Sequence, residues 1–174
     1  MARLAQTDGL TDVQEAILDA VHLFVDKEII PVANELEHAD EYPQAIVDGL
    51  KELGVFGLMI PEEYGGLGES LLTYALVVEE IARGWMPVSG VINTHFIVAY
   101  MLMQHGTQEQ KDKYLPRMAT GEVRGAFSMS EPGVGSDVSG ITSKAVRDGD
   151  GWSLTGQKMW LTNGGSSTLV AVLV

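Results

Sequence analysis

Apolar side chains recur at helical spacing through the first part of the chain. The first run follows Thr11 and Gln14, whose types and spacing match a capping box at the start of a helix. Pro31 lies within the continuing pattern and predicts a kink or break near Ile30, because proline has no N–H to donate to a helical hydrogen bond. One face of this helix is formed by Val13, Ile17, Val21 and Phe24.

Four further helices are predicted before residue 120. Pro43 is a favoured first residue of a helix, and Gly54, Gly84 and Gly106 are typical residues just past a helix end. The predicted helices span residues 43–53, 71–83, 89–105 and 107–119, and a short apolar stretch at 55–60 and a loop at 61–68 separate the first two. Residues 1–120 are therefore predicted to form an all-helical N-terminal domain.

The pattern changes after Gly121 to short stretches typical of strands, separated by turns. Ten of the 20 glycines lie between Gly121 and Gly165. Strands are predicted at residues 124–129, 142–146, 152–155, 157–162 and 168–174, and the Asp-Gly-Asp-Gly sequence at 148–151 predicts a hairpin turn rather than a calcium loop. Residues 121–174 are interpreted as the start of a β-barrel or β-sandwich domain.

The last strand is continuously apolar from Leu169 to Val174. Such a strand is typical of the interior of a sheet, with neighbours on both sides. We therefore expect the β domain to have further strands beyond Val174.

Composition excludes several classes of function. The chain has 11 Lys and Arg against 24 Asp and Glu, for a net charge of −13, which disfavours binding to nucleic acid or to an anionic membrane. It has no cysteine, so disulfides and thiolate chemistry are excluded. No apolar run reaches the roughly 18 residues of a membrane span, and no signal-peptide core is present, so a cytoplasmic location is expected.

The titratable residues give no metal site. Histidines occur at positions 22, 38, 95 and 105 without ligand spacing, and no metal is expected. His95 lies in an apolar stretch and is interpreted as a core or pocket-lining histidine rather than a catalyst. The acidic stretch at residues 35–41 is interpreted as a solvated helix face and loop.

Two segments of the β part could bind a ligand. In the sequence Ser-Glu-Pro-Gly-Val-Gly-Ser-Asp at 130–137, two glycines and flanking hydroxyls allow a backbone nest for phosphate, although an ordinary surface loop is the alternative. In the segment at 157–165, Trp160 could cover a flat aromatic ligand beside a hydroxyl, and the alternative is a tryptophan that fills the sheet core.

Together these segments resemble signatures of the acyl-CoA dehydrogenase family of flavoproteins. The resemblance rests on four ordered motifs at residues 61–68 (PEEYGGLG), 106–111 (GTQEQK), 126–137 (AFSMSEPGVGSD) and 156–164 (GQKMWLTNG), and it runs over essentially the whole chain. It implies a helical domain, a β domain and a C-terminal helical bundle, with FAD between the last two.

The resemblance also implies roles for individual residues. The strand and turn that meet the flavin ring would be Phe127, Ser128, Met129 and Ser130, with Trp160 covering the ring, Leu161 beside it, and Thr162 reaching its N5 edge. Ser136 would touch both the cofactor and the CoA arm of the substrate. The implied reaction is α,β-dehydrogenation of an acyl-CoA, with electrons passing to an electron-transfer flavoprotein.

Several expectations concern the whole protein. Family chains are more than twice this length, and their catalytic glutamate belongs to the C-terminal bundle, so no catalytic residue is assigned in this chain, and Glu131 is not identified as the base. The resemblance implies a homo-oligomer in the full-length form. An acyl-CoA oxidase on the same scaffold and a non-catalytic subunit or binding module are the alternatives.

Overall fold

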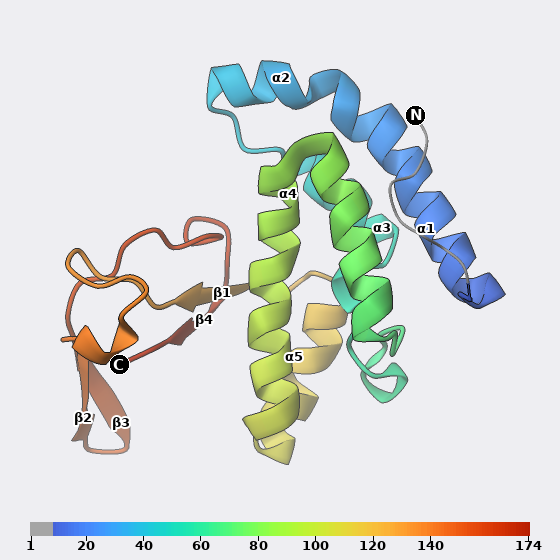
Figure 1. Cartoon of the computed structure of the whole chain (residues 1–174). Helices are drawn as coiled ribbons and strands as arrows, with labels where there is room; N and C mark the ends of the chain where they lie inside the picture. The colour runs from blue at the N-terminus through green and yellow to red at the C-terminus, as the bar shows by residue number, and fades with distance from the viewer. Residues whose placement is uncertain (1–8) are drawn as a thin grey trace.

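The computed structural model describes residues 9–174, and the chain begins with helices that meet at a bend (Figure 1). In α1 (Asp12–Phe24) the Thr11 hydroxyl accepts the Gln14 N–H and the Gln14 side chain accepts the Thr11 N–H, so the predicted capping box is confirmed. A π-helical turn, η1 (Val25–Ile29), precedes α2 (Ile30–Ala39). The wider turn falls just before Pro31, which confirms the predicted kink near Ile30.

A short helix and two single turns follow. α3 (Gln44–Glu52) ends before Gly54, which has a φ of 74° that suits glycine, as predicted from the sequence. The 3₁₀ turns η2 (Val55–Gly57) and η3 (Glu62–Tyr64) lead into the loop predicted at 61–68. This loop folds back on η2, where the Leu67 N–H donates to the Gly57 carbonyl over 2.9 Å.

The longest helix, α4 (Leu71–His105), turns back on itself at Trp85, whose φ of −160° and ψ of 105° are not helical. Its two arms lie side by side (Figure 1), joined by a 2.9 Å hydrogen bond from the Tyr74 hydroxyl to the Asn93 side chain and by edge-on contact of Tyr74 with Phe96. Burial raises the pKa of Tyr74 to about 12, so its hydroxyl keeps the proton that it donates. The two helices predicted on either side of Gly84 are therefore the two arms of α4.

Within residues 9–174, α4 is the helix whose length and composition would also suit a membrane span. Half of this apolar stretch is buried inside the protein. Because α4 is also bent at Trp85, we assign its buried apolar side chains to the core of the fold.

α5 (Gln108–Ala119) starts with a second capping box at Thr107 and completes the helical part. The core lies where α1, η1, η2 and α5 face α4, and α3 joins it through its contacts with η2. Its largest fully buried apolar side chains are Leu18, Ile29, Leu50, Phe56, Leu58, Ile60, Ile81, Ile92, Leu115 and Met118. Residues 35–41 of α2 and the following loop are mostly exposed, as expected.

The remaining residues form two separate strand pairs beside the second arm of α4 (Figure 1). β1 (Gly125–Ser128) runs parallel to β4 (Leu169–Val172), and β2 (Lys144–Asp148) forms the predicted hairpin with β3 (Gly151–Thr155). A 3₁₀ turn, η4 (Val138–Gly140), lies in the loop before β2. The fold is therefore a helical domain followed by the start of a strand-containing domain, as predicted.

The prediction of a strand at residues 157–162 was wrong. This segment has no strand pairing, and Trp160 has a φ of 57°, which no extended strand allows. The physical reason is that its Met159 N–H donates to the Ser130 carbonyl of a loop rather than to a strand. The turn predicted at 163–165 is present, with the Gly164 N–H donating to the Leu161 carbonyl over 2.9 Å.

Candidate functional site

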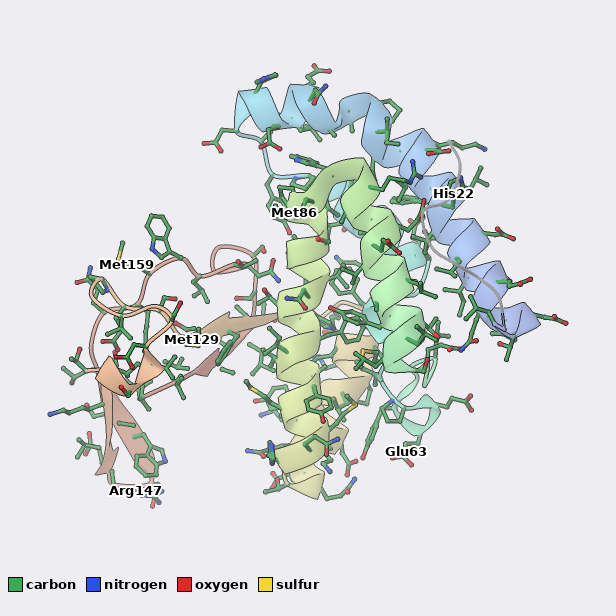
Figure 2. All side chains as sticks on the ribbon, viewed as in Figure 1. His22, Glu63, Met86, Met129, Arg147 and Met159 are labelled. Carbon is green, nitrogen blue, oxygen red and sulfur yellow. The ribbon has the colours of Figure 1, made fainter. Side chains whose placement is uncertain are left out.

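The structure brings together the two segments that the sequence singled out. The Met159 N–H donates to the Ser130 carbonyl over 2.9 Å, and the Lys158 ammonium donates to the Met129 carbonyl over 3.0 Å. Met129 and Met159 both lie on the side of α4 that carries the strands (Figure 2). Residues 127–130 and 158–162 therefore form one surface, although nearly 30 residues separate them in the sequence.

Glu131 is buried beneath this surface and joins three segments. Its carboxylate accepts hydrogen bonds from the N–H and hydroxyl of Thr142, from the Ser143 N–H, and from Lys158 at 2.9 Å. The hydrogen bonds from Ser143 and Thr142 hold the pKa of Glu131 far below its usual range. Because the carboxylate is ionised and fully hydrogen-bonded, it holds the loop in place and cannot serve as a general base near neutral pH.

Trp160 extends from this surface into solvent, with 83% of the residue exposed. Leu161 is half-buried and Thr162 is exposed. Thr162 lies near Gly90 of α4, because a Cβ built on Gly90 would be 4.0 Å from the Thr162 methyl. The alternative of a core tryptophan is therefore excluded. The exposed indole has a face available for a flat ligand.

Asn163 fixes the turn that follows Thr162, and sequence reasoning missed this role. Its buried amide donates to the Val91 carbonyl of α4 over 2.9 Å and to the Gly125 carbonyl of β1 over 3.2 Å. The only signal in the sequence was an asparagine before two glycines, a pattern that indicates a turn and says nothing about its partners.

The candidate residues of β1 differ in what they can offer. Phe127 packs against the helical core and Ser128 is buried, so a ligand could reach them mainly through their backbone. Met129 and Ser130 are half-buried, and their N–H groups have no acceptor among residues 9–174. Two backbone donors without protein acceptors are suited to an acceptor edge of a ligand.

The loop at residues 130–140 is tied at its base and open at its tip. Glu131 and Val134 exchange backbone hydrogen bonds of 2.9 and 3.1 Å, and the Asp137 carboxylate accepts the Ser139 N–H. Ser136 is exposed, and no hydrogen bond joins it to the other candidate residues of the described chain. A Cβ placed on Gly133 or Gly135 would meet nothing within 4 Å, so the tip has room for a ligand.

This donor set fits FAD. The exposed indole of Trp160 suits the flat isoalloxazine, the N–H groups of Met129 and Ser130 suit its acceptor edge, and the open loop tip at Ser136 suits the phosphates. Over residues 9–174 no group of three His, Asp or Glu side chains is placed to hold a metal ion.

A helical domain that leads into a strand-containing domain defines the class of fold. Two family models match the chain: "Acyl-CoA dehydrogenase, N-terminal domain" over residues 11–122 and "Acyl-CoA dehydrogenase, middle domain" over residues 126–174. The chain belongs to the acyl-CoA dehydrogenase family.

Curated relatives agree with this assignment. A (2S)-methylsuccinyl-CoA dehydrogenase from Cereibacter sphaeroides is 37% identical over 166 residues, which are 95% of this chain and 30% of that protein. A short-chain-specific acyl-CoA dehydrogenase from Clostridium acetobutylicum is 34% identical over 90% of this chain and 42% of that protein. The chain thus spans less than half the length of these relatives.

Solved structures give the same fold. Butyryl-CoA dehydrogenase from Megasphaera elsdenii matches with a TM-score of 0.87 and 35% identity, over 94% of this chain and 44% of that chain. A structure from work on the electron transferring flavoprotein of Acidaminococcus fermentans matches with a TM-score of 0.89 and 34% identity, over 96% of this chain and 44% of that chain. A glutaryl-CoA dehydrogenase from Mycobacterium smegmatis in complex with FADH2 matches with a TM-score of 0.86 and 30% identity, over 94% and 42%.

Proposed function

We propose that residues 1–174 form the flavin-contacting part of an FAD-dependent acyl-CoA dehydrogenase. The observation that carries the proposal is the surface made by residues 127–130 and 158–162, where an exposed indole lies beside two backbone N–H groups without protein acceptors. Membership of the family and the match to a glutaryl-CoA dehydrogenase holding FADH2 support FAD as the ligand.

The chain's own residues would bind and orient the reactants. Trp160 would cover one face of the flavin ring, Thr162 would direct its hydroxyl toward the N5 edge, and the N–H groups of Met129 and Ser130 would stabilise negative charge at the pyrimidine edge. When bound, FAD supplies the acceptor for the two electrons and the β-hydrogen of an acyl-CoA. Ser136 at the loop tip would contact both the cofactor and the CoA arm.

The base that removes the α-proton is assigned to none of the described residues. Glu131, the carboxylate nearest in sequence to the flavin-contacting residues, is engaged in four hydrogen bonds and stays ionised as a structural group. We propose that the base comes from another part of the family's fold, as the resemblance implies.

The proposal is tested on the protein as its gene encodes it. Purified protein is expected to show the visible flavin band, and addition of butyryl-CoA or glutaryl-CoA without oxygen is expected to bleach it. Trp160→Ala is the informative variant because that side chain is 83% exposed, so its loss leaves folding intact while it weakens FAD binding. A protein that folds, takes up no FAD and gives no bleaching would contradict the proposal.

Partners are also proposed. Electrons would pass to an electron-transfer flavoprotein, supported by the similarity to the Acidaminococcus fermentans structure, and the protein would act as a homo-oligomer in the cytoplasm. Oxygen consumption with acyl-CoA and no added flavoprotein acceptor would instead indicate an acyl-CoA oxidase.

A second candidate is a non-catalytic module that docks on a catalytic partner. The observation that favours it is β4, which pairs with β1 alone among residues 9–174 and leaves Val170 and Val172 exposed. Flavin uptake and bleaching by the protein alone would rule out this second candidate.

A further inference from the structure

His95 lies on the second arm of α4 and is completely buried. Its Nδ1 accepts the Gly125 N–H over 3.3 Å, and its Nε2 is 3.2 Å from the Phe56 carbonyl. An N–H partner requires a lone pair on Nδ1 and a carbonyl partner requires a proton on Nε2, so the two contacts together assign the tautomer. Edge-on contacts with Phe56 and Phe96, at centroid distances of 5.0 and 5.4 Å, fix the ring.

The partner of His95 is the first residue of β1. The Gly125 N–H donates to His95, and the Gly125 carbonyl accepts the amide of Asn163 over 3.2 Å. A Cβ on Gly125 would come within 2.7 Å of Val98 on α4, so the strand is pressed against the helix at this point. Both polar groups of this buried glycine are thus used to fix where β1 and the 163–165 turn begin.

We infer that His95 is a positioning residue for the flavin-contacting surface: by accepting the Gly125 N–H it sets β1 against α4. Phe127 to Ser130 follow closely after Gly125, and Asn163 directly follows Thr162, so a shift at this joint would move both halves of the surface. The inference rests on the proposed function, because the surface matters only where FAD binds.

The electrostatic surroundings keep the joint intact near neutral pH. The Phe56 carbonyl on η2, the Met118 carbonyl on α5 and the guanidinium of Arg124, one residue before β1, also influence the pKa of the ring. Burial lowers the pKa of His95 to about 4, so the imidazole stays neutral and Nδ1 keeps its lone pair.

Two conservative variants distinguish the contributions of the two hydrogen bonds of His95, because each variant keeps one bond and loses the other. The Oδ1 of asparagine occupies about the place of Nδ1, so His95→Asn can still accept the Gly125 N–H but loses the bond to Phe56. The amide of glutamine reaches about the place of Nε2, so His95→Gln keeps the bond to Phe56 and leaves the buried Gly125 N–H without an acceptor. Each variant loses one buried hydrogen bond, so a general loss of stability affects both alike.

The first measurement is amide hydrogen exchange of Gly125 in the protein without cofactor. His95→Gln is expected to exchange at least about tenfold faster at Gly125 than the wild type, and His95→Asn to remain within about threefold of it. Equal exchange in the two variants would overturn the role of His95, whether or not the protein binds FAD.

The second measurement is FAD affinity by titration of the visible spectrum. His95→Gln is expected to weaken FAD binding about tenfold, while His95→Asn stays close to the wild type. Equal weakening by both variants, or none by His95→Gln, would refute the positioning role. A wild-type protein that folds but binds no FAD would instead contradict the proposed function. The exchange experiment would still show whether His95 holds β1 against α4.

Discussion

Folding stability should depend on pH through His95, and the size of the effect follows from its burial. Burial lowers the pKa of His95 to about 4, whereas a histidine in the unfolded chain titrates near 6.5. Between these two values the unfolded state binds the extra proton, so the free energy of unfolding falls as the pH drops from about 6.5 toward 4. Above about pH 7.5 the residue is almost entirely neutral in both states and contributes little pH dependence.

The magnitude comes from proton linkage at this single site. With those two pKa values, His95 alone should remove about 2 kcal/mol of stability between pH 7 and pH 5. This is a large share of the roughly 5–15 kcal/mol that stabilises an ordinary domain. The physical reason is that protonation places a charge between the rings of Phe56 and Phe96 and turns Nδ1 into a donor that faces the Gly125 N–H.

The assay is urea unfolding followed by circular dichroism at pH 7, 6 and 5, for the wild type and for His95→Asn. The 24 acidic residues also titrate toward low pH, and they do so in both proteins, so the difference between the two pH profiles isolates His95. The wild type should lose about 2 kcal/mol more than the variant over this range. Parallel profiles would show that His95 does not stay neutral, and the reasoning from burial would be wrong.

Three further predictions follow from single contacts. Glu131→Gln should lower the melting temperature and speed proteolysis of the 130–143 loop, because four hydrogen bonds end on that carboxylate, whereas Glu63→Gln on the exposed η3 turn should change neither. Gly66→Ala should cost about 2–3 kcal/mol in urea unfolding, because a Cβ there would overlap a backbone carbonyl, and Gly133→Ala, with nothing within 4 Å, should stay within about 0.5 kcal/mol of the wild type. Trp160→Phe should change the free energy of unfolding in urea by no more than about 0.5 kcal/mol, since the residue is 83% exposed. The same variant should weaken FAD binding severalfold in a spectral titration. A clear loss of stability would instead show that the indole packs in the core.

Local chemistry explains why the helical part could be predicted from the sequence. The capping boxes at Thr11 and Thr107 and the positive φ of Gly54 depend only on residues within one turn, so sequence patterns identify them. The bend of α4 was visible as an interruption between Gly84 and Ser89, but not as two arms lying side by side. That arrangement depends on Tyr74 meeting Asn93, a contact 19 residues apart.

The β part was predicted less well because its hydrogen bonds join distant residues. β1 pairs with β4 across more than 40 residues, and nothing local selects that partner or its parallel direction. Residues 157–162 lie between Gly156 and the turn at 163–165, as a short strand would, but the acceptor of the Met159 N–H is a loop carbonyl at Ser130, so the segment leaves the sheet. Periodicity predicts which side chains can face a core, and it cannot tell which backbone groups will meet.

Three buried polar side chains explain how this irregular surface can still be well defined. Glu131 accepts hydrogen bonds from Thr142, Ser143 and Lys158, His95 accepts one from Gly125, and Asn163 donates to Val91 and Gly125. Each of these side chains therefore ties a segment at or next to the candidate site to another part of the fold. Apolar packing alone would leave such loops free to slide, because it has no preferred direction, whereas a buried hydrogen bond is lost if its partner moves by an ångström. The exposed Trp160 can therefore be held by a rigid base without making core contacts of its own, which is the condition for an aromatic face to remain free for a ligand.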